Sequence, residues 1–138
     1  MRVSQRLDYV LSVLVLLAGR PERTFVAAGD LAGLLGLPPR FVEQQITTLA
    51  RAGIVESRRG PGGGCALARP ASQISVEEVV VALQGEVLDV PLRPGSATAE
   101  LWHRLAAVNS DFLGSVDLAT LARRQRELDG RSTPMYYI

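Results

Sequence analysis

Polar side chains share one face of a helix that the sequence predicts from about Pro39 to Ala52. The apolar residues of this stretch, such as Val42 and Ile46, recur at helical spacing and fall on the opposite face. In the major groove of DNA, arginine can pair with guanine, glutamine with adenine, and glutamate with the amino group of cytosine. The polar face is therefore a candidate for reading base edges, through Arg40, Glu43, Gln44 and Thr47.

Two arginines stand at the start of a glycine-rich segment that follows this helix. Short extended runs at 54–58 and 65–68 flank the glycines, which predicts a β-hairpin with a glycine-rich tip. Arg58 and Arg59, beside Gly60, could there reach phosphates or the minor groove next to a helix in the major groove. A nucleotide phosphate loop is the other interpretation, but the Lys-Ser/Thr pair is missing and the segment joins two strands.

Three predicted helices precede the hairpin. The first spans the apolar residues at helical spacing in 7–17, and the second covers 30–35. Ala32, Gly36 and Val42 have the spacing of a helix-turn-helix, in which a small residue lets the helices approach and a glycine lets the turn bend. Helix, helix, helix and hairpin in this order predict a winged helix-turn-helix. Three further arginines suit phosphate contacts, namely Arg2, Arg6 and Arg51.

The second half of the chain is predicted to be helical and to hold two subunits together. Ser75 and Glu78 form a capping box that begins a fourth helix, which ends at Gly85. A longer helix from about Ala97 carries an apolar stripe broad enough for both a core and a partner chain. The stripe consists of Leu101, Trp102, Leu105, Val108 and Phe112.

These elements predict a mainly α protein with a small β-hairpin wing. We expect a DNA-binding domain in 1–85, a connector in 86–96, dimerisation helices in 97–130 and a carboxy-terminal tail in 131–138.

The charge distribution and composition of the chain favour a regulator over an enzyme or a membrane protein. The net charge is +1, but residues 1–70 hold nine arginines and five acids, whereas residues 71–138 hold six arginines and nine acids. The apolar run near residues 10–18 is too short to span a bilayer, and we expect a cytoplasmic protein. A catalytic set would have to use His103 with a serine and Asp8 or Asp111, and helical amphipathicity explains His103 without one.

Metal and cofactor sites are not expected, because the chain has one cysteine and one histidine. These two residues cannot form an intrachain disulfide or a zinc site of the usual kind.

Several motifs resemble the Rrf2 family of winged-helix transcription regulators. They are RFVEQQI at 40–46, LARAGIV at 49–55, RGPGGG at 59–64 and LARP at 67–70. The resemblance implies a dimer whose long carboxy-terminal helices cross between subunits. It also implies recognition-helix positions at Arg40, Phe41, Glu43 and Gln44, and a wing arginine, Arg59, that enters the minor groove.

The sequence departs from the cluster-sensing members of that family. Those relatives carry three cysteines in the region that matches 86–105, and this chain has none there. The carboxy-terminal part is similar to the cluster-free branch, the cysteine metabolism repressors typified by CymR, most clearly in the ending MYYI at 135–138. In that branch cysteine synthase binds the repressor. The resemblance implies that Tyr136, Tyr137 and Ile138 dock to cysteine synthase, the terminal carboxylate mimicking that of an amino acid.

The leading interpretation is a cluster-independent repressor that binds a pseudo-palindromic operator in double-stranded DNA as a homodimer. Three alternatives stay open. The tail could fold back on its own dimer, or the chain could act mainly as an interaction module through that tail. Cys65 could be a thiol-based redox switch or simply a small buried strand residue.

Overall fold

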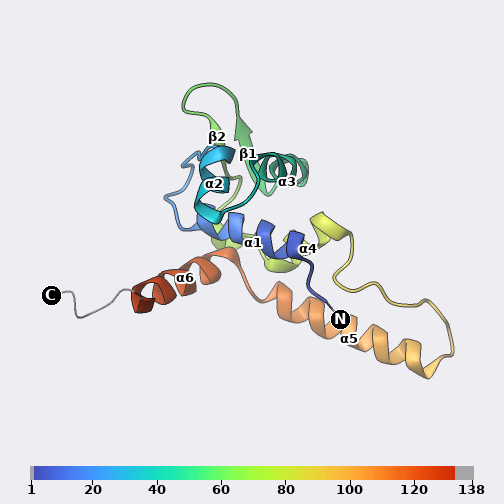
Figure 1. The fold of residues 1–138 in the computed structure, drawn as a ribbon. Helices are drawn as coiled ribbons and strands as arrows, with labels where there is room; N and C mark the ends of the chain where they lie inside the picture. Colours follow the sequence, from blue (N-terminus) through green and yellow to red (C-terminus); the bar gives the residue numbers. More distant parts are fainter. Residues whose placement is uncertain (1, 133–138) are drawn as a thin grey trace.

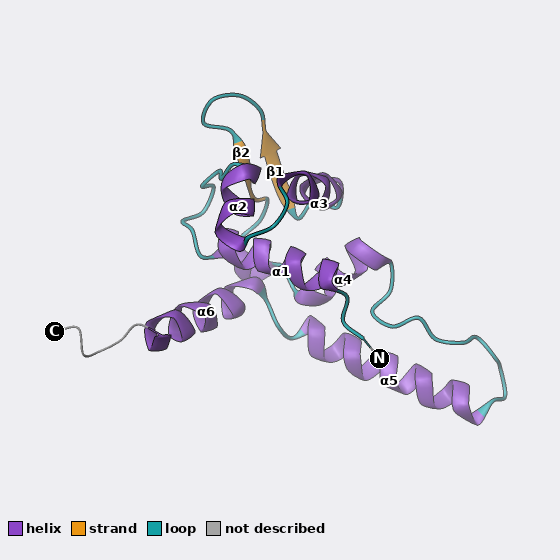
Figure 2. Ribbon diagram, in the orientation of Figure 1, coloured by secondary structure: helices purple, strands orange, loops and turns teal. Residues whose placement is uncertain are grey.

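A computed structural model describes residues 2–132 and confirms the predicted mainly α fold with a small β-hairpin (Figures 1 and 2). Within that range the elements are α1 (Gln5–Ala18), α2 (Ala28–Leu35), α3 (Pro39–Arg51), β1 (Val55–Arg58), β2 (Gly64–Leu67), a 3-10 turn η1 (Ala71–Gln73), α4 (Val76–Gln84), α5 (Ala97–Gly114) and α6 (Leu118–Ser132). Helix α6 is described as far as Ser132, two residues beyond 130, where the sequence predicts the end of the helical part.

The ends of the helices follow from local chemistry. Ser4 and Ser75 cap α1 and α4 by accepting a hydrogen bond from a backbone N–H of the first turn. Gly36 ends α2 in the left-handed conformation, with φ 66°, which glycine adopts without steric cost. One half of the predicted capping box forms, because the Ser75 hydroxyl accepts from the Glu78 N–H. The Glu78 carboxylate pairs with Arg69 instead of capping the helix.

The core forms around α1, which contacts α2, α4, α6 and β2. Val10 and Leu14 of α1 are completely buried there. Val42 is also completely buried, and α2 packs against α3, as the helix-turn-helix spacing predicts. This packing fixes the angle at which α3 presents its opposite face to solvent.

The hairpin is a short antiparallel pair whose register is set from Val55 opposite Leu67 to Arg58 opposite Gly64. A third segment joins it, because Val26 and Cys65 exchange two backbone hydrogen bonds of 2.9 Å each. The sequence predicted the hairpin but not this bridge, which ties the loop before α2 to the wing.

Helix α5 projects from the compact part of the molecule (Figure 1). Within the described chain Ala99 is the buried residue of α5. The helix as a whole contacts mainly α4. The apolar stripe is largely open: Leu101, Val108 and Phe112 are 56%, 63% and 64% exposed. Within 2–132, no helix combines the length and the apolar character needed to cross a bilayer.

Candidate nucleic-acid interface

The outer face of α3 is exposed and polar. Val42, Ile46 and Leu49 anchor the helix in the core. The residues on the opposite side are open to solvent: Arg40, Glu43, Gln44, Thr47 and Arg51. The Thr47 hydroxyl donates to the Glu43 carbonyl at 3.1 Å, so its hydroxyl is turned back toward its own helix.

One of the predicted contact residues, Arg6, also holds the interface in place. Arg6 donates from Nε to Oε1 of Gln45 at 2.8 Å and from a terminal nitrogen to the Leu83 carbonyl at 3.4 Å. Arg6 therefore links the start of α1 to α3 and to the end of α4, while its side chain stays exposed. Gln45, 8% exposed, is a residue that the sequence reasoning missed; a single amide between the buried Val42 and Ile46 was the signal.

Phe41 packs inward more than it faces solvent. It is half-buried, and its ring meets the ring of Tyr9 edge to face, with centroids 6.1 Å apart. Phe41 therefore positions the first turn of α3 against α1. Arg2, in contrast, is exposed ahead of α1.

The wing presents two arginines in different settings. Arg59 and Gly60 lie in the exposed turn, which a hydrogen bond of 2.9 Å from the Gly63 N–H to the Gly60 carbonyl closes. Arg58, at the end of β1, stacks over the ring of Phe25 at 4.2 Å from the centroid. Neither Phe25 nor Glu56, which pairs with Arg58 from within β1, was predicted as part of the interface; Phe25 lies outside the hairpin, and no local pattern connects it to the wing.

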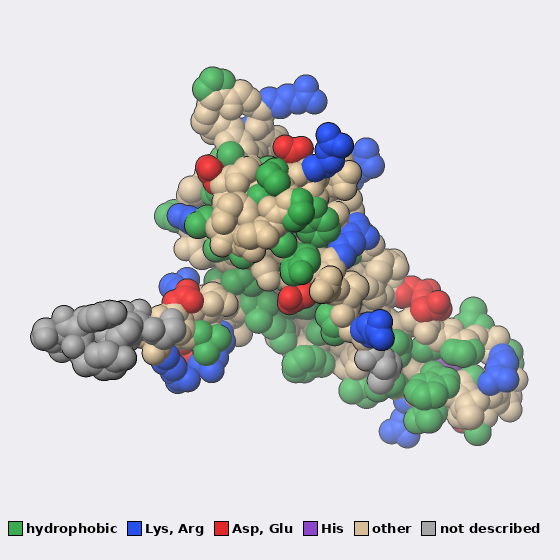
Figure 3. Space-filling model, viewed as in Figure 1, with side chains coloured by type: hydrophobic (Ala, Val, Ile, Leu, Met, Phe, Trp, Pro, Cys, Tyr) green, Lys and Arg blue, Asp and Glu red, His purple; other side chains and the backbone are tan. Residues whose placement is uncertain are grey.

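The helix face and the wing tip lie on the same side of the molecule. Helix α3 packs against β1, and Figure 3 shows basic side chains over α3 and beside the hairpin tip. A helix in the major groove with a basic hairpin at its flank is the geometry by which winged helices contact two grooves.

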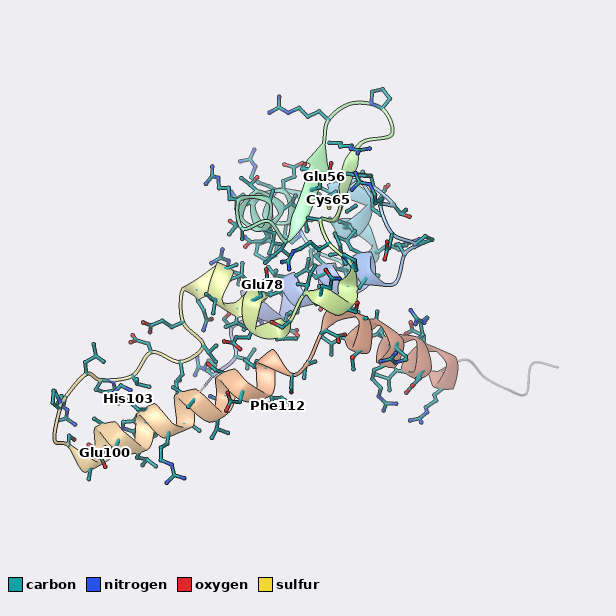
Figure 4. The ribbon with its side chains drawn as sticks, turned by 180° about the vertical axis from the view of Figure 1, so that it is seen from behind. Glu56, Cys65, Glu78, Glu100, His103 and Phe112 are labelled. Carbon is teal, nitrogen blue, oxygen red and sulfur yellow. The ribbon has the colours of Figure 1, made fainter. Side chains whose placement is uncertain are left out.

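The residues of the chain do not fit an iron–sulfur cluster or another transition-metal centre. Cys65, the one cysteine of the sequence, lies in β2 (Figure 4), and burial raises the pKa of its thiol to about 11. His103 is exposed on α5. Across residues 2–132 no three of the His, Cys, Asp and Glu side chains are grouped closely enough to hold a metal ion. A cluster needs several thiolates or imidazoles, which this donor set cannot supply.

Comparison with known proteins agrees with this architecture. The model of the Rrf2 family, described as iron-dependent transcriptional regulators, matches residues 3–124. The chain belongs to the Rrf2 family. Like other members of the family, it is a DNA-binding transcription regulator and not an enzyme.

Two groups of relatives stand out among the similar proteins. The regulator IscR of Xenorhabdus nematophila is 31% identical over 138 residues, which cover 94% of this chain and 84% of that protein. The structure of CymR, the global cysteine regulator of Bacillus subtilis, is 26% identical with a TM-score of 0.80, covering 90% of this chain and 98% of CymR. The IscR structure from T. potens is 27% identical with a TM-score of 0.78, and the match covers 99% of this chain and 95% of that IscR chain.

Proposed function

We propose that this Rrf2 chain is a homodimeric repressor that binds a pseudo-palindromic operator in the cytoplasm and needs no iron–sulfur cluster. The observation that carries the proposal is the exposed polar face of α3 beside the basic hairpin tip. The 1–85 segment serves as the DNA-binding domain, and Arg40, Glu43 and Gln44 contact base edges. Arg59 enters the minor groove, while Arg2, Arg6, Arg51 and Arg58 contact phosphates.

A second copy of the chain is the occupant that we assign to the apolar stripe of α5. Leu101, Leu105, Val108 and Phe112 recur at spacings of four, three and four residues, which is the seam of two helices packed side by side. Leu105 is half-buried, and the other members of this seam are more than half exposed. Residues 97–130 then form the dimerisation part, with 86–96 as its connector.

Salt-dependent binding tests the DNA interface. The wild-type chain is titrated against a duplex selected from a random-sequence pool, and the logarithm of its affinity is expected to fall linearly with the logarithm of the salt concentration. Arg59→Ala should reduce the magnitude of this slope by about one for each subunit. Gln44→Ala should cost about 1–3 kcal/mol of binding free energy on the selected sequence only. Arg126→Ala on α6 is the matched control. Wild-type binding without salt dependence would contradict the proposal.

Sedimentation tests the dimer. Phe112→Ser should shift the equilibrium toward monomer, because it removes a large apolar side chain from the seam. Leu92→Ser is the control, since Leu92 is 84% exposed in the connector and lies off the stripe. Equal masses for wild type and both variants at low concentration would count against this use of α5.

Control of cysteine metabolism by docking to cysteine synthase is a second proposal. The likeness to CymR, a global cysteine regulator, favours it. The docking residues Tyr136, Tyr137 and Ile138 lie outside the described range. Deleting these three residues should abolish co-purification with cysteine synthase and leave DNA affinity unchanged; retained co-purification would refute the docking. If the enzyme is never captured but the tail still binds another protein, the chain is an interaction module of a different kind.

A redox role for Cys65 is the weaker alternative. The thiol is 1% exposed and its pKa is raised, so the reactive thiolate is scarce at neutral pH.

A further inference from the structure

An aromatic side chain from outside the wing supports one of the wing arginines. The bridge between Val26 and Cys65 places the loop before α2 alongside β2, so that three backbone segments lie next to one another. Gly64 sits where this approach is closest: an added Cβ would overlap the carbonyl of Val26. Glycine at position 64 therefore allows the loop that carries Phe25 to lie directly against the wing.

Strand alternation brings Phe25 and Arg58 to the same face. The Cys65 side chain points into the core, so positions 64 and 66 of β2 belong to the opposite face of the hairpin. The register places Arg58 opposite Gly64 and Glu56 opposite Ala66 on that face. The small side chains on β2 leave room for a ring and a guanidinium to meet across the strand. The Arg58 guanidinium lies 4.2 Å from the centroid of Phe25, within range of a cation–π interaction.

A carboxylate completes the arrangement. The Glu56 carboxylate forms ion pairs with Arg58 at 3.5 Å and with Arg23 at 3.1 Å, and the Arg23 guanidinium lies over the same ring at 5.8 Å. Arg23 is the non-glycine residue of the described chain with a positive φ, 59°, so the loop adopts an uncommon backbone conformation where it meets the wing. The Glu56 carboxylate is thus paired with two guanidinium groups that both lie over the ring of Phe25.

We propose that Phe25 is a positioning residue of the DNA interface, whose ring, with Glu56, holds Arg58 in the conformation that meets the DNA backbone. This inference rests on the proposed function, in which Arg58 contacts DNA. The stacked guanidinium is half-exposed and keeps donors free for a phosphate. Because its orientation is already restricted, less conformational freedom is lost on binding.

A double-mutant cycle tests the inference on the full chain, with the selected duplex as the probe. Phe25→Leu should weaken binding about two- to fivefold, the size of an exposed cation–π interaction, without changing the salt slope. Phe25→Tyr, which keeps the ring, should bind as wild type does. Arg58→Ala should reduce both affinity and slope, and Phe25→Leu should have no further effect in that background.

The outcomes separate the inference from the function on which it rests. If Phe25→Leu weakens binding equally with and without Arg58, or if Arg58→Ala binds as wild type does, the inference is overturned although the chain is still a DNA-binding protein. If no duplex is enriched by the wild type, the proposed function itself fails. Circular dichroism monitors folding, and Phe25→Met replaces Phe25→Leu if the latter does not fold.

Discussion

Alkaline pH should destabilise this protein through one thiol. Burial raises the pKa of Cys65 from 9.0 to about 11, so the folded state holds the thiol proton more tightly than the unfolded state does. The stabilisation is complete below pH 9 and is lost as the pH rises from 9 to 11. Between these two pKa values each pH unit costs about 1.4 kcal/mol, so the free energy of unfolding should fall by about 1.4 kcal/mol at pH 10 and by about 2 kcal/mol at pH 11, where half of the folded thiols are still protonated.

The composition makes this titration unusually easy to isolate. All fifteen basic residues are arginine, so no lysine titrates in the same range, and the three tyrosines are common to wild type and variant. Urea unfolding of wild type and Cys65→Ala at one protein concentration, from pH 7 to pH 10.5, gives the difference between them. That difference should shrink by the stated amount above pH 9. A constant difference over the whole range would refute the desolvation of Cys65.

Three further predictions concern the same region and its neighbours. In the folded protein Cys65 should react with iodoacetamide at pH 7 far more slowly than in urea, because about one thiol in ten thousand is ionised; equal rates would contradict its burial. Gly64→Ala should destabilise the protein by more than the roughly 1–2 kcal/mol expected of Gly62→Ala, since both have positive φ but the added Cβ has open space at 62 only; equal losses in urea unfolding would count against the close contact. Arg6→Ala should cost about 1–3 kcal/mol by leaving the Gln45 amide buried without its partner, and adding Gln45→Leu should recover most of it; a double variant less stable than the single one would exclude this explanation.

Features that depend on neighbours along the chain could be predicted from sequence. Helical periodicity and the glycine at 36 located α2 and α3, and the serine at 75 marked the start of α4. The features that were missed depend on contacts between distant residues. Arg6 and Gln45 are 39 positions apart, and although Gln45 falls on the buried face of its helix, nothing in the sequence indicates that Arg6 is its partner.

The loop before α2 shows the same limit at the interface. Its pairing with the wing is a single β-bridge at Val26, too short to leave an alternating pattern in the sequence. Phe25 therefore carries no local signal of its contact with Arg58. The exposed residues of α3 that we propose as DNA contacts could be placed on the solvent face from sequence, because helical periodicity alone separates them from the buried face.

The chain leaves the core at the end of α4 and returns to it beside the beginning of the same helix. The Val76 N–H donates to the Val116 carbonyl at 2.8 Å, and the Leu118 N–H donates to the Ile74 carbonyl at 3.0 Å. These two backbone hydrogen bonds hold the beginning of α6 against the beginning of α4. The segment between α4 and α6, which includes α5, projects from the core and packs mainly against α4. Insertions or deletions in this segment would alter its length while the packing beneath α3 stays intact, so in the dimer that we propose the distance between subunits can change while the exposed face of α3 does not.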